Sequence, residues 1–309
     1  MPSPQIPVHT DQSVRLSSHY GILLREDIAF TNRQGIEKRG IRKRAEQALE
    51  KLQEPLRKIL EPGEAVLYIA RGQVMPSGVE QFFLGWQAQY LAPALLLLTN
   101  RRLLHLFVTR NGMWKRGMRS AHWGDIEEAK VKGLLSPKLH LRYRNGKKEI
   151  YWGMRGGDAK KIRLLLEVLL PTAAGETSPA LSMTSVCPDC YAALTSGLYE
   201  CPHCRLRFKD ERTALRRSLL IPGGGFFYTG HPLLGVFHMV VGVFLLYEIA
   251  YWVSAALGLL QPPSNPGQPH GDPRAALIVA AYLAGLLALE KWVMATVARK
   301  LVRNYIPAS

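Results

Sequence analysis

The chain has 309 residues, of which 47% are hydrophobic and 21% are charged, so it is too long for one ordinary domain and too apolar for a disordered chain. Its 40 Lys and Arg residues outnumber 24 acidic residues, which gives a net charge of +16. Residues 61–170 alone carry 18 basic and 9 acidic residues. We therefore expect a polyanionic partner, either a membrane surface or a nucleic acid.

The N-terminal 60 residues divide into two parts. Residues 1–34 show no clear periodicity and are expected to form a loosely ordered arm, without a secretory signal peptide. Residues 35–60 repeat apolar side chains at three- and four-residue intervals and carry a basic cluster at 38–44, which predicts an amphipathic basic helix. This helix could pack beside the next domain, or it could contact a membrane surface or another protomer.

Residues 61–170 contain short apolar runs separated by turn signals, a pattern typical of antiparallel strands. Asn111-Gly112 and Asn145-Gly146 predict two hairpin turns of type I′, in which both residues need positive φ. Asp158 can cap a helix over Ala159–Leu170, in which every third or fourth residue is apolar. The expected strands are GEAVLYIARG, APALLLLTN, RRLLHLFVTR, IEEAKVKG, KLHLRYR and KEIYWGM.

Three segments of this region carry a family resemblance. They are Gly63–Leu67, Leu97–Leu103 and Trp123–Glu128, followed by the amphipathic helix. With them the region resembles the bacterial pleckstrin-homology-like (PH-like) family, which implies an antiparallel β domain closed by a C-terminal helix. The fold resemblance does not imply a particular ligand.

Positive charge is concentrated in residues 101–163, which hold 17 basic and 5 acidic residues, a net charge of +12. One interpretation is a solvated surface that improves solubility. The other is contact with anionic headgroups, with Trp114 as an interfacial anchor, because each Lys or Arg near such a surface contributes about 1 kcal/mol. The candidate lipid- or anion-binding residues are Arg101, Arg102, Lys115, Arg116, Arg119, Lys147 and Lys148.

All four cysteines lie between residues 187 and 204, after a linker at 171–185. Cys187, Cys190, Cys201 and Cys204 form two C-x2-C pairs separated by ten residues, a spacing that lets two tight turns present four thiolates to one tetrahedral ion. A closed four-sulfur site leaves no position for substrate, so we expect a structural zinc ion in residues 186–209, with iron as the alternative.

The spacing resembles the zinc-ribbon family. Tyr191 and Arg205 stand where that family commonly has glycine after each cysteine pair. The net charge of residues 171–215 is −1, which favours a spacer or protein-contact role over nucleic-acid binding.

Residues 210–309 are expected to form a transmembrane hairpin, with spans near 233–258 and 275–298. The alternative for the second stretch is a buried core helix. Lys and Arg flank the hairpin before the first span and after the second, whereas the loop at 261–274 has only Arg274. Positive charge stays on the cytoplasmic side, so we expect a multi-pass protein of the cytoplasmic (inner) membrane with both termini cytoplasmic.

Three charged residues fall within the spans, and isolated charges in lipid are costly. Glu248 and Lys291 lie at similar depths in an antiparallel hairpin, so we hypothesise that they pair within the hairpin or across an oligomer. Alternatively, Lys291 extends to the cytoplasmic interface with Glu290 and Glu248 is protonated.

Ile221–His231 precedes the first span and reads IPGGGFFYTGH. With Gly235, it resembles the bacterial two-transmembrane-helix (TM-two) family over about 219–298. The resemblance implies a topology and no enzymatic activity.

The overall expectation is an α+β multidomain membrane protein. We find no nucleophile elbow, HExxH, P-loop or dinucleotide fingerprint, so an enzyme is the least favoured class. The leading hypothesis is a membrane-anchored adaptor or scaffold whose PH-like domain binds anionic lipid or a protein partner, with homo-oligomerisation as a further possibility. The alternatives are a membrane-tethered nucleic-acid-binding protein and a small oligomeric transport or channel subunit.

Overall fold

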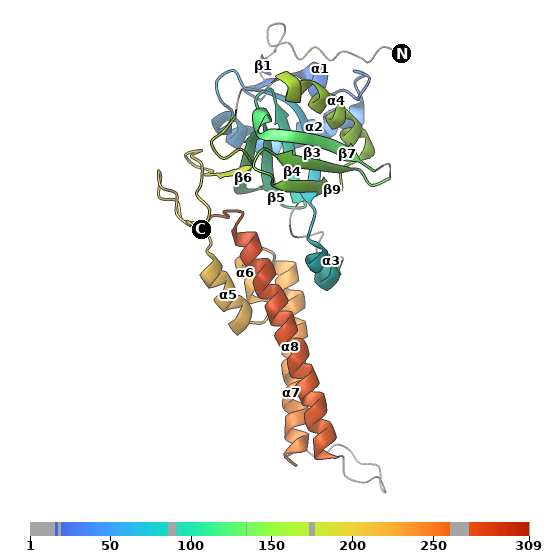
Figure 1. Ribbon diagram of the computed structural model, residues 1–309, viewed down its shortest axis with the longest axis vertical. Helices are drawn as coiled ribbons and strands as arrows, with labels where there is room; N and C mark the ends of the chain where they lie inside the picture. Colours follow the sequence, from blue (N-terminus) through green and yellow to red (C-terminus); the bar gives the residue numbers. More distant parts are fainter. Residues whose placement is uncertain are drawn as a thin grey trace. The chain divides into compact units, whose positions relative to one another are not determined.

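The computed structural model describes residues 16–17, 20–85, 91, 93–133, 135–172, 177–259 and 272–308. They form two compact units, which we call the body and the hairpin unit. The body contains the described residues up to Gln81 and from 91 to 207, and it is a mixed α+β structure (Figure 1). The hairpin unit contains residues 208–308 and the end of helix α3 (Gly78–Leu84), and its regular structure is helical.

The body contains ten strands and several helices within its described residues. The strands are β1 (Leu16–Ser17), β2 (Ile22–Leu24), β3 (Ala65–Val74), β4 (Pro93–Thr99), β5 (Arg102–Val108), β6 (Trp114–His122), β7 (Ile126–Lys132), β8 (Lys138–Tyr143), β9 (Lys148–Trp152) and β10 (Thr184–Val186). The helices are α1 (Glu26–Ala29), α2 (Arg39–Ile59), the 3-10 turn η2 (Trp123–Asp125) and α4 (Gly156–Thr172).

The strands form one sheet in the order β10-β6-β5-β4-β3-β9-β8-β7, with antiparallel neighbours along this path. One edge of β3 pairs with β4 over most of its length. The other edge pairs with β2 in parallel at Ala65–Val66 and with β9 at Gln73–Val74. Strand β3 therefore joins the β4–β6 meander to the β7–β9 meander.

Helices α2 and α4 cover opposite faces of the sheet (Figure 1). Successive side chains of a strand point to opposite faces. In β4, Leu96 and Leu98 belong to the core that contains the apolar side of α4, whereas Leu95 and Leu97 belong to the core that contains the apolar side of α2. Burial on both faces explains why β4 and β5 read as continuous apolar runs.

The predicted strands at 61–152 correspond to β3, β4, β5, β7, β8 and β9, and the predicted helix lies within α4. Strand β6 was not predicted, because its sequence WKRGMRSAH is too polar for an apolar run. Both Asn-Gly pairs form hairpin turns, but only Gly112 (φ 80°) and Gly146 (φ 81°) have positive φ. The predicted type I′ geometry is therefore wrong.

The N-terminal segment is more ordered than expected between residues 20 and 34. Leu24 and Ile28 are buried, and β2 extends the sheet at β3. The reason is that this segment supplies apolar side chains to the two cores. At the other end, β10 pairs with β6 inside the region expected to be a linker at 171–185, of which residues 173–176 lie outside the described chain.

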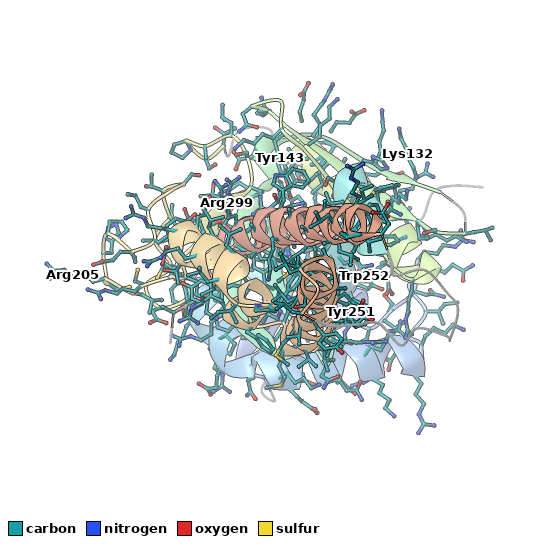
Figure 2. All side chains as sticks on the ribbon, turned by 90° about the horizontal axis from the view of Figure 1, so that it is seen from below. Lys132, Tyr143, Arg205, Tyr251, Trp252 and Arg299 are labelled. Atoms are coloured by element: carbon teal, nitrogen blue, oxygen red, sulfur yellow. The ribbon has the colours of Figure 1, made fainter. Side chains whose placement is uncertain are left out.

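The hairpin unit contains α5 (Glu211–Leu220), α6 (Gly224–Tyr228), α7 (Pro232–Ala256) and α8 (Pro273–Val302). Helices α7 and α8 are 25 and 30 residues long, and both are long and apolar enough to cross a membrane. At about 1.5 Å per residue they exceed a hydrocarbon core of about 30 Å. Tyr251 and Trp252 lie side by side in α7 (Figure 2), which is typical of a headgroup interface.

The glycine run before α7 is required by close packing. Gly223 has a φ of 72°, and a Cβ at this residue would lie 2.0 Å from the carbonyl oxygen of Gly235 in α7. A Cβ at Gly225 would lie 2.1 Å from the Oγ of Ser218 in α5. The glycines thus let α6 fit tightly against its neighbours, which is a packing role that agrees with the absence of a phosphate-loop motif.

Candidate functional site

Two of the seven predicted lipid-binding cations, Arg102 and Arg119, are largely buried in the body. Arg102 is 8% exposed, and its Nη2 lies 2.8 Å from Oε2 of the fully buried Glu64. The same guanidinium donates through Nε to Glu64 Oε1 at 3.0 Å and through Nη2 to the Ile59 carbonyl. Arg102 therefore fixes the start of β5 to the end of α2, and its assignment to a lipid-binding surface is wrong.

Arg119 in β6 forms an ion pair with Glu149 in β9 and has a side chain only 20% exposed. The Glu149 carboxylate also accepts hydrogen bonds from Tyr143 (3.2 Å) and Tyr151 (2.9 Å). The Tyr151 hydroxyl lies 3.1 Å from Nδ1 of the fully buried His105. Burial, with Arg119 nearby, holds the pKa of His105 well below its usual range, so this ring is neutral and structural. Arg119 therefore also belongs to an interior network.

The other five predicted cations are at least partly accessible. Arg101 pairs with Glu61 at 3.0 Å, and Lys115 is half-buried. Arg116 pairs with Asp189 at 2.7 Å, whereas Lys147 and Lys148 are exposed and have no carboxylate partner among the described residues. Trp114, the predicted interfacial anchor, is half-buried and donates through its indole N–H to the Gly117 carbonyl.

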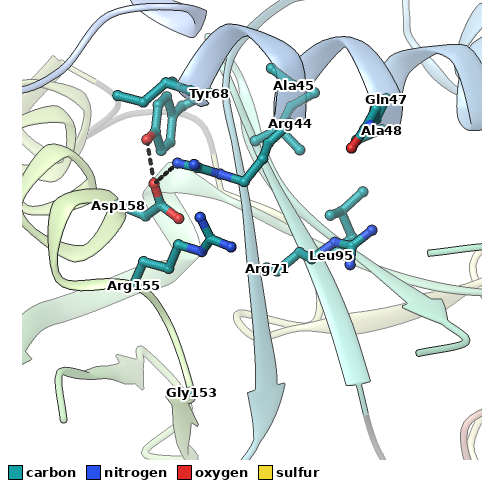
Figure 3. A pocket seen from close by; sticks show the side chains of 12 residues that line it. Arg44, Ala45, Gln47, Ala48, Tyr68, Arg71, Leu95, Gly153, Arg155 and Asp158 are labelled. Atoms are coloured by element: carbon teal, nitrogen blue, oxygen red, sulfur yellow. Dashed lines mark hydrogen bonds and ion pairs between the residues drawn. The ribbon is translucent and has the colours of Figure 1, made fainter. Parts of the chain in front are cut away.

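Sequence reasoning missed a basic cleft in the body. Arg44 from α2, Arg71 from β3 and Arg155 just before α4 line a cavity of about 330 Å³. Asp158 also lines it, accepts a hydrogen bond from Tyr68 at 2.9 Å and lies 3.5 Å from Arg44 (Figure 3). These side chains come from separate elements, so no local motif could have indicated the cleft.

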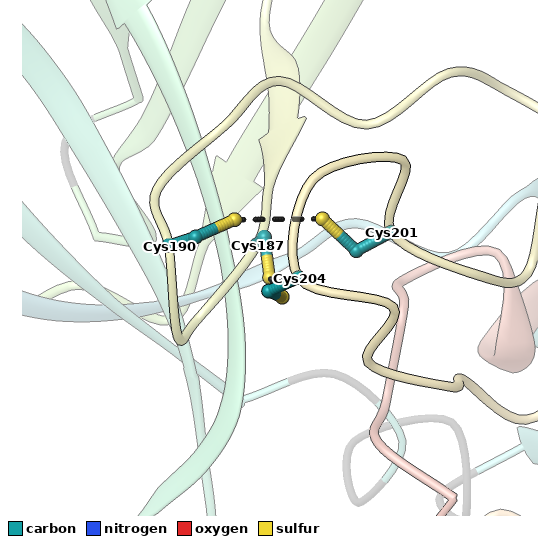
Figure 4. A group of neighbouring side chains, drawn as sticks. All are labelled: Cys187, Cys190, Cys201 and Cys204. Carbon is teal, nitrogen blue, oxygen red and sulfur yellow. Dashed lines mark hydrogen bonds between the residues drawn. The ribbon is translucent and has the colours of Figure 1, made fainter.

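The side chains of the four cysteines converge on one point (Figure 4). Their sulfur atoms all lie within 4.8 Å of one another, with Cys187 3.5 Å from Cys204 and Cys190 3.4 Å from Cys201. A tetrahedral site with metal–sulfur distances of about 2.3 Å has sulfur–sulfur separations of about 3.8 Å. The cluster therefore fits a four-thiolate metal site, as the spacing predicted, and the cysteines form no disulfide.

The two cysteine pairs have the same backbone geometry. In the first, the Cys187 N–H donates to the Ala192 carbonyl; in the second, the Cys201 N–H donates to Leu206, both at 2.9 Å. The residues that follow the pairs, Tyr191 and Arg205, have φ values of 61° and 58°. They adopt the left-handed conformation that favours glycine, the residue that the sequence pattern predicts at both positions.

Backbone N–H groups in the turns also bear on the thiol chemistry. Burial raises the pKa of Cys187 to about 12. Burial also acts to raise the pKa of Cys201, but hydrogen bonds with the backbone N–H groups of Cys204 and His203 and with the Cys190 and Cys204 thiols together outweigh it and lower this pKa to about 7. A metal ion would complete the site by taking all four sulfurs as thiolates.

The first turn is attached to the sheet. Strand β10 leads directly into Cys187 and pairs with β6, with Val186 opposite Met118. Val186 is buried in the α2-side core, and Tyr191 packs against it. The Arg116–Asp189 ion pair joins β6 to the first turn. The cysteine cluster is therefore continuous with the body at its first turn.

The polar residues of the hairpin unit differ from the predicted arrangement. Oε1 of Glu290 in α8 lies 2.9 Å from Nδ1 of His238 in α7, and Nζ of Lys291 lies 3.9 Å from Oε2 of Glu290. Glu248 is half-exposed about three turns beyond His238 in α7, and no ion pair joins it to Lys291. The hypothesised Glu248–Lys291 pair within the hairpin is therefore wrong. His238 was missed because its partner lies 52 residues away.

Comparison with protein-family models, with curated proteins and with solved structures gives no match. The structure itself supports an antiparallel sheet, a four-cysteine cluster suited to a metal and two helices of spanning length.

Proposed function

We propose that this protein is a membrane-anchored, non-catalytic adaptor whose body binds an anionic lipid surface. The observation that carries the proposal is that exposed cations without carboxylate partners, such as Lys147 and Lys148, stand on the same chain as two helices of spanning length. A tethered body stays close to headgroups, and each Lys or Arg near an anionic surface contributes about 1 kcal/mol.

The connectivity of the body favours the PH-like fold. A meander of β3–β6 is followed by a second meander of β7–β9, and α4 packs against the core between them. PH-like domains share this order of strands and C-terminal helix. Helix α2 and the N-terminal strands are additions to that pattern in this chain.

Zinc is the ion that best suits the four-cysteine cluster, because four thiolates in a tetrahedral, closed arrangement are typical of structural zinc. Such a site leaves no coordination position for water or substrate. We therefore assign it a structural role, in which the ion holds the second turn, Cys201–Cys204, to the first, Cys187–Cys190.

The orientation follows from the positions of Lys and Arg around the hairpin. Arg299 and Lys300 lie in the last turn of α8, and α5 before the first span contains Arg212, Arg216 and Arg217. The positive-inside rule then places both termini and the body on the cytoplasmic side of the membrane.

The test uses the full chain in nanodiscs of phosphatidylcholine, mixed with vesicles of phosphatidylcholine alone or with added phosphatidylglycerol. We expect binding to the anionic vesicles only, and a loss of about thirtyfold for the K147Q/K148Q double variant, from about 1 kcal/mol per charge. Arg163→Gln is the control, because Arg163 already pairs with Glu167, and it should change binding less.

Equal binding to neutral and anionic vesicles would contradict the proposal. Tighter binding to duplex DNA or RNA than to anionic vesicles at the same ionic strength would favour the nucleic-acid alternative.

A further inference from the structure

The cleft between α2 and the sheet is lined by charged side chains of both signs. Its walls carry the guanidinium groups of Arg44, Arg71 and Arg155, and among the described residues only one carboxylate, that of Asp158, lines it. The cleft therefore has a formal charge of +2. It lies between α2, strand β3 and the start of α4, and its lining also includes Ala45 and Ala48. These small side chains leave room between helix and sheet that larger residues would fill.

Asp158 is already held by partners. Its side chain is 9% exposed, and it accepts the Tyr68 hydroxyl and faces Arg44 (Figure 3). Burial, together with the Asp158 charge, raises the pKa of Tyr68, so the hydroxyl remains a donor. The Arg44–Asp158 contact at 3.5 Å is longer than a strong charge-assisted hydrogen bond, which leaves Arg44 able to turn toward another anion.

Arg71 and Arg155 have no carboxylate within ion-pair distance among the residues that the structure describes. A Cβ added at Gly112 would lie 2.5 Å from Nη2 of Arg71. The β5–β6 turn thus packs directly against this guanidinium. Both side chains are exposed, so their guanidinium groups are available to an anion that enters the cavity.

We propose that this cleft binds a phosphomonoester dianion, carried either by a lipid headgroup or by a small soluble phosphate ester. Its charge of about −2 near neutral pH matches the +2 of the cleft. The planar fork of arginine donates paired hydrogen bonds to phosphate oxygens, which favours this ligand over a monoanionic diester. The cavity is also within the range of about 300–1,000 Å³ found for small-ligand sites. For the lipid source, the inference rests on the proposed function and specifies its ligand.

The experiment uses the full chain in phosphatidylcholine nanodiscs and has two arms. In the lipid arm, vesicles that contain phosphatidate or phosphatidylglycerol are compared at matched surface potential. In the soluble arm, glycerol 3-phosphate is titrated by calorimetry. The test variant is R71Q/R155Q, and the control is K147Q/K148Q, which removes the same charge from an exposed turn.

We expect the wild type to prefer phosphatidate vesicles at least tenfold, to bind glycerol 3-phosphate saturably, or both. Preference for the vesicles alone assigns the lipid source, and saturable soluble binding assigns the free ester. R71Q/R155Q should abolish either effect. K147Q/K148Q should weaken binding to both kinds of anionic vesicle equally and keep the preference for phosphatidate.

Asp158→Asn is a second test variant, chosen because its expected effect is a gain of binding, which misfolding would not produce. Asparagine keeps an acceptor for Tyr68 but removes the competing charge from Arg44, so the phosphate affinity should rise severalfold. A preference that survives in R71Q/R155Q, or an affinity unchanged in Asp158→Asn, would overturn the inference. Binding of both anionic lipids without preference, and no binding of glycerol 3-phosphate, would overturn it while leaving the proposed function intact. Saturable glycerol 3-phosphate binding without vesicle binding would support the inference for the soluble ester and contradict the proposed function.

Discussion

The two turns of the cysteine cluster have the same backbone geometry and different surroundings. Each contains Cys-Pro-x-Cys, each closes with a 2.9 Å backbone hydrogen bond, and each is followed by a residue with positive φ. Cys187 is fully buried and follows β10, which is paired with the sheet. In the second turn Cys201 is buried as well, but Pro202–Arg205 are all exposed, whereas Pro188 of the first turn is buried.

This difference separates two causes of structure. The local sequence sets the conformation of both turns, because proline and the cysteine spacing favour the same tight bend twice. Burial depends on the neighbours, since Val186 and Tyr191 of the first turn pack into the body and the second turn has exposed residues. The first turn should therefore keep much of its structure without a metal, whereas the second should depend on it.

The largest effect is expected from removal of the metal. Cys204→Ser removes one ligand from an exposed position, so it should abolish stable metal binding with little loss of packing. Apparent metal-binding free energies of structural zinc sites are about 10–16 kcal/mol, and most of that stabilisation would be lost. Metal content by mass spectrometry should fall from one ion per chain. Hydrogen exchange should rise strongly at 197–207 and weakly at 184–192.

A chelator applied to the wild-type chain is the matching control and should give the same exchange pattern. Equal loss of protection in both turns would show that the sheet does not support the first turn. Retention of the ion in Cys204→Ser would show that the four sulfurs do not act as one site.

A smaller and opposite pair of effects is expected at the two positions with positive φ. Arg205→Gly should stabilise the second turn by about 1 kcal/mol, because an exposed non-glycine residue is strained in this conformation. Tyr191→Gly gains the same relief but loses a side chain packed in the α2-side core, so it should destabilise the first turn by about 1–2 kcal/mol net. The rate of metal transfer to a chromogenic chelator measures both. The same sign for both variants would contradict the difference in packing.

The contrast between local and distant causes also explains what the sequence could predict. The cysteine cluster was predictable because its spacing is a local pattern, and β4 and β5 were predictable because burial on both faces makes them continuously apolar. Strand β6 was not predictable, because its Arg119 is accommodated in the interior by an ion pair with Glu149, which lies 30 residues away in β9. Tertiary pairing in this case overrides a polar sequence.

The same reasoning applies to the cations. Net charge indicated a basic domain, but it could not distinguish Arg102, which a buried Glu64 neutralises, from the exposed Lys147. It could not indicate the basic cleft either, since Arg44, Arg71 and Arg155 meet only through the packing of α2 on the sheet. In the hairpin unit, depth along the helices suggested Lys291 and Glu248 as partners, whereas helix packing brings His238 to Glu290.

The smallest effect is expected from the ion pair between β6 and the first turn. Arg116 and Asp189 lie 2.7 Å apart, but both side chains are nearly half exposed, and such pairs contribute about 0.2–1 kcal/mol. A double-mutant cycle with Arg116→Gln and Asp189→Asn, read by hydrogen exchange at 184–192, should give a coupling in that range that decreases with added salt. A larger coupling, insensitive to salt, would mean that the pair and not the Val186 contact attaches the turn. Because Val186 is buried in the core and the ion pair faces solvent, we expect Val186→Ala to destabilise the attachment more than the loss of either charge.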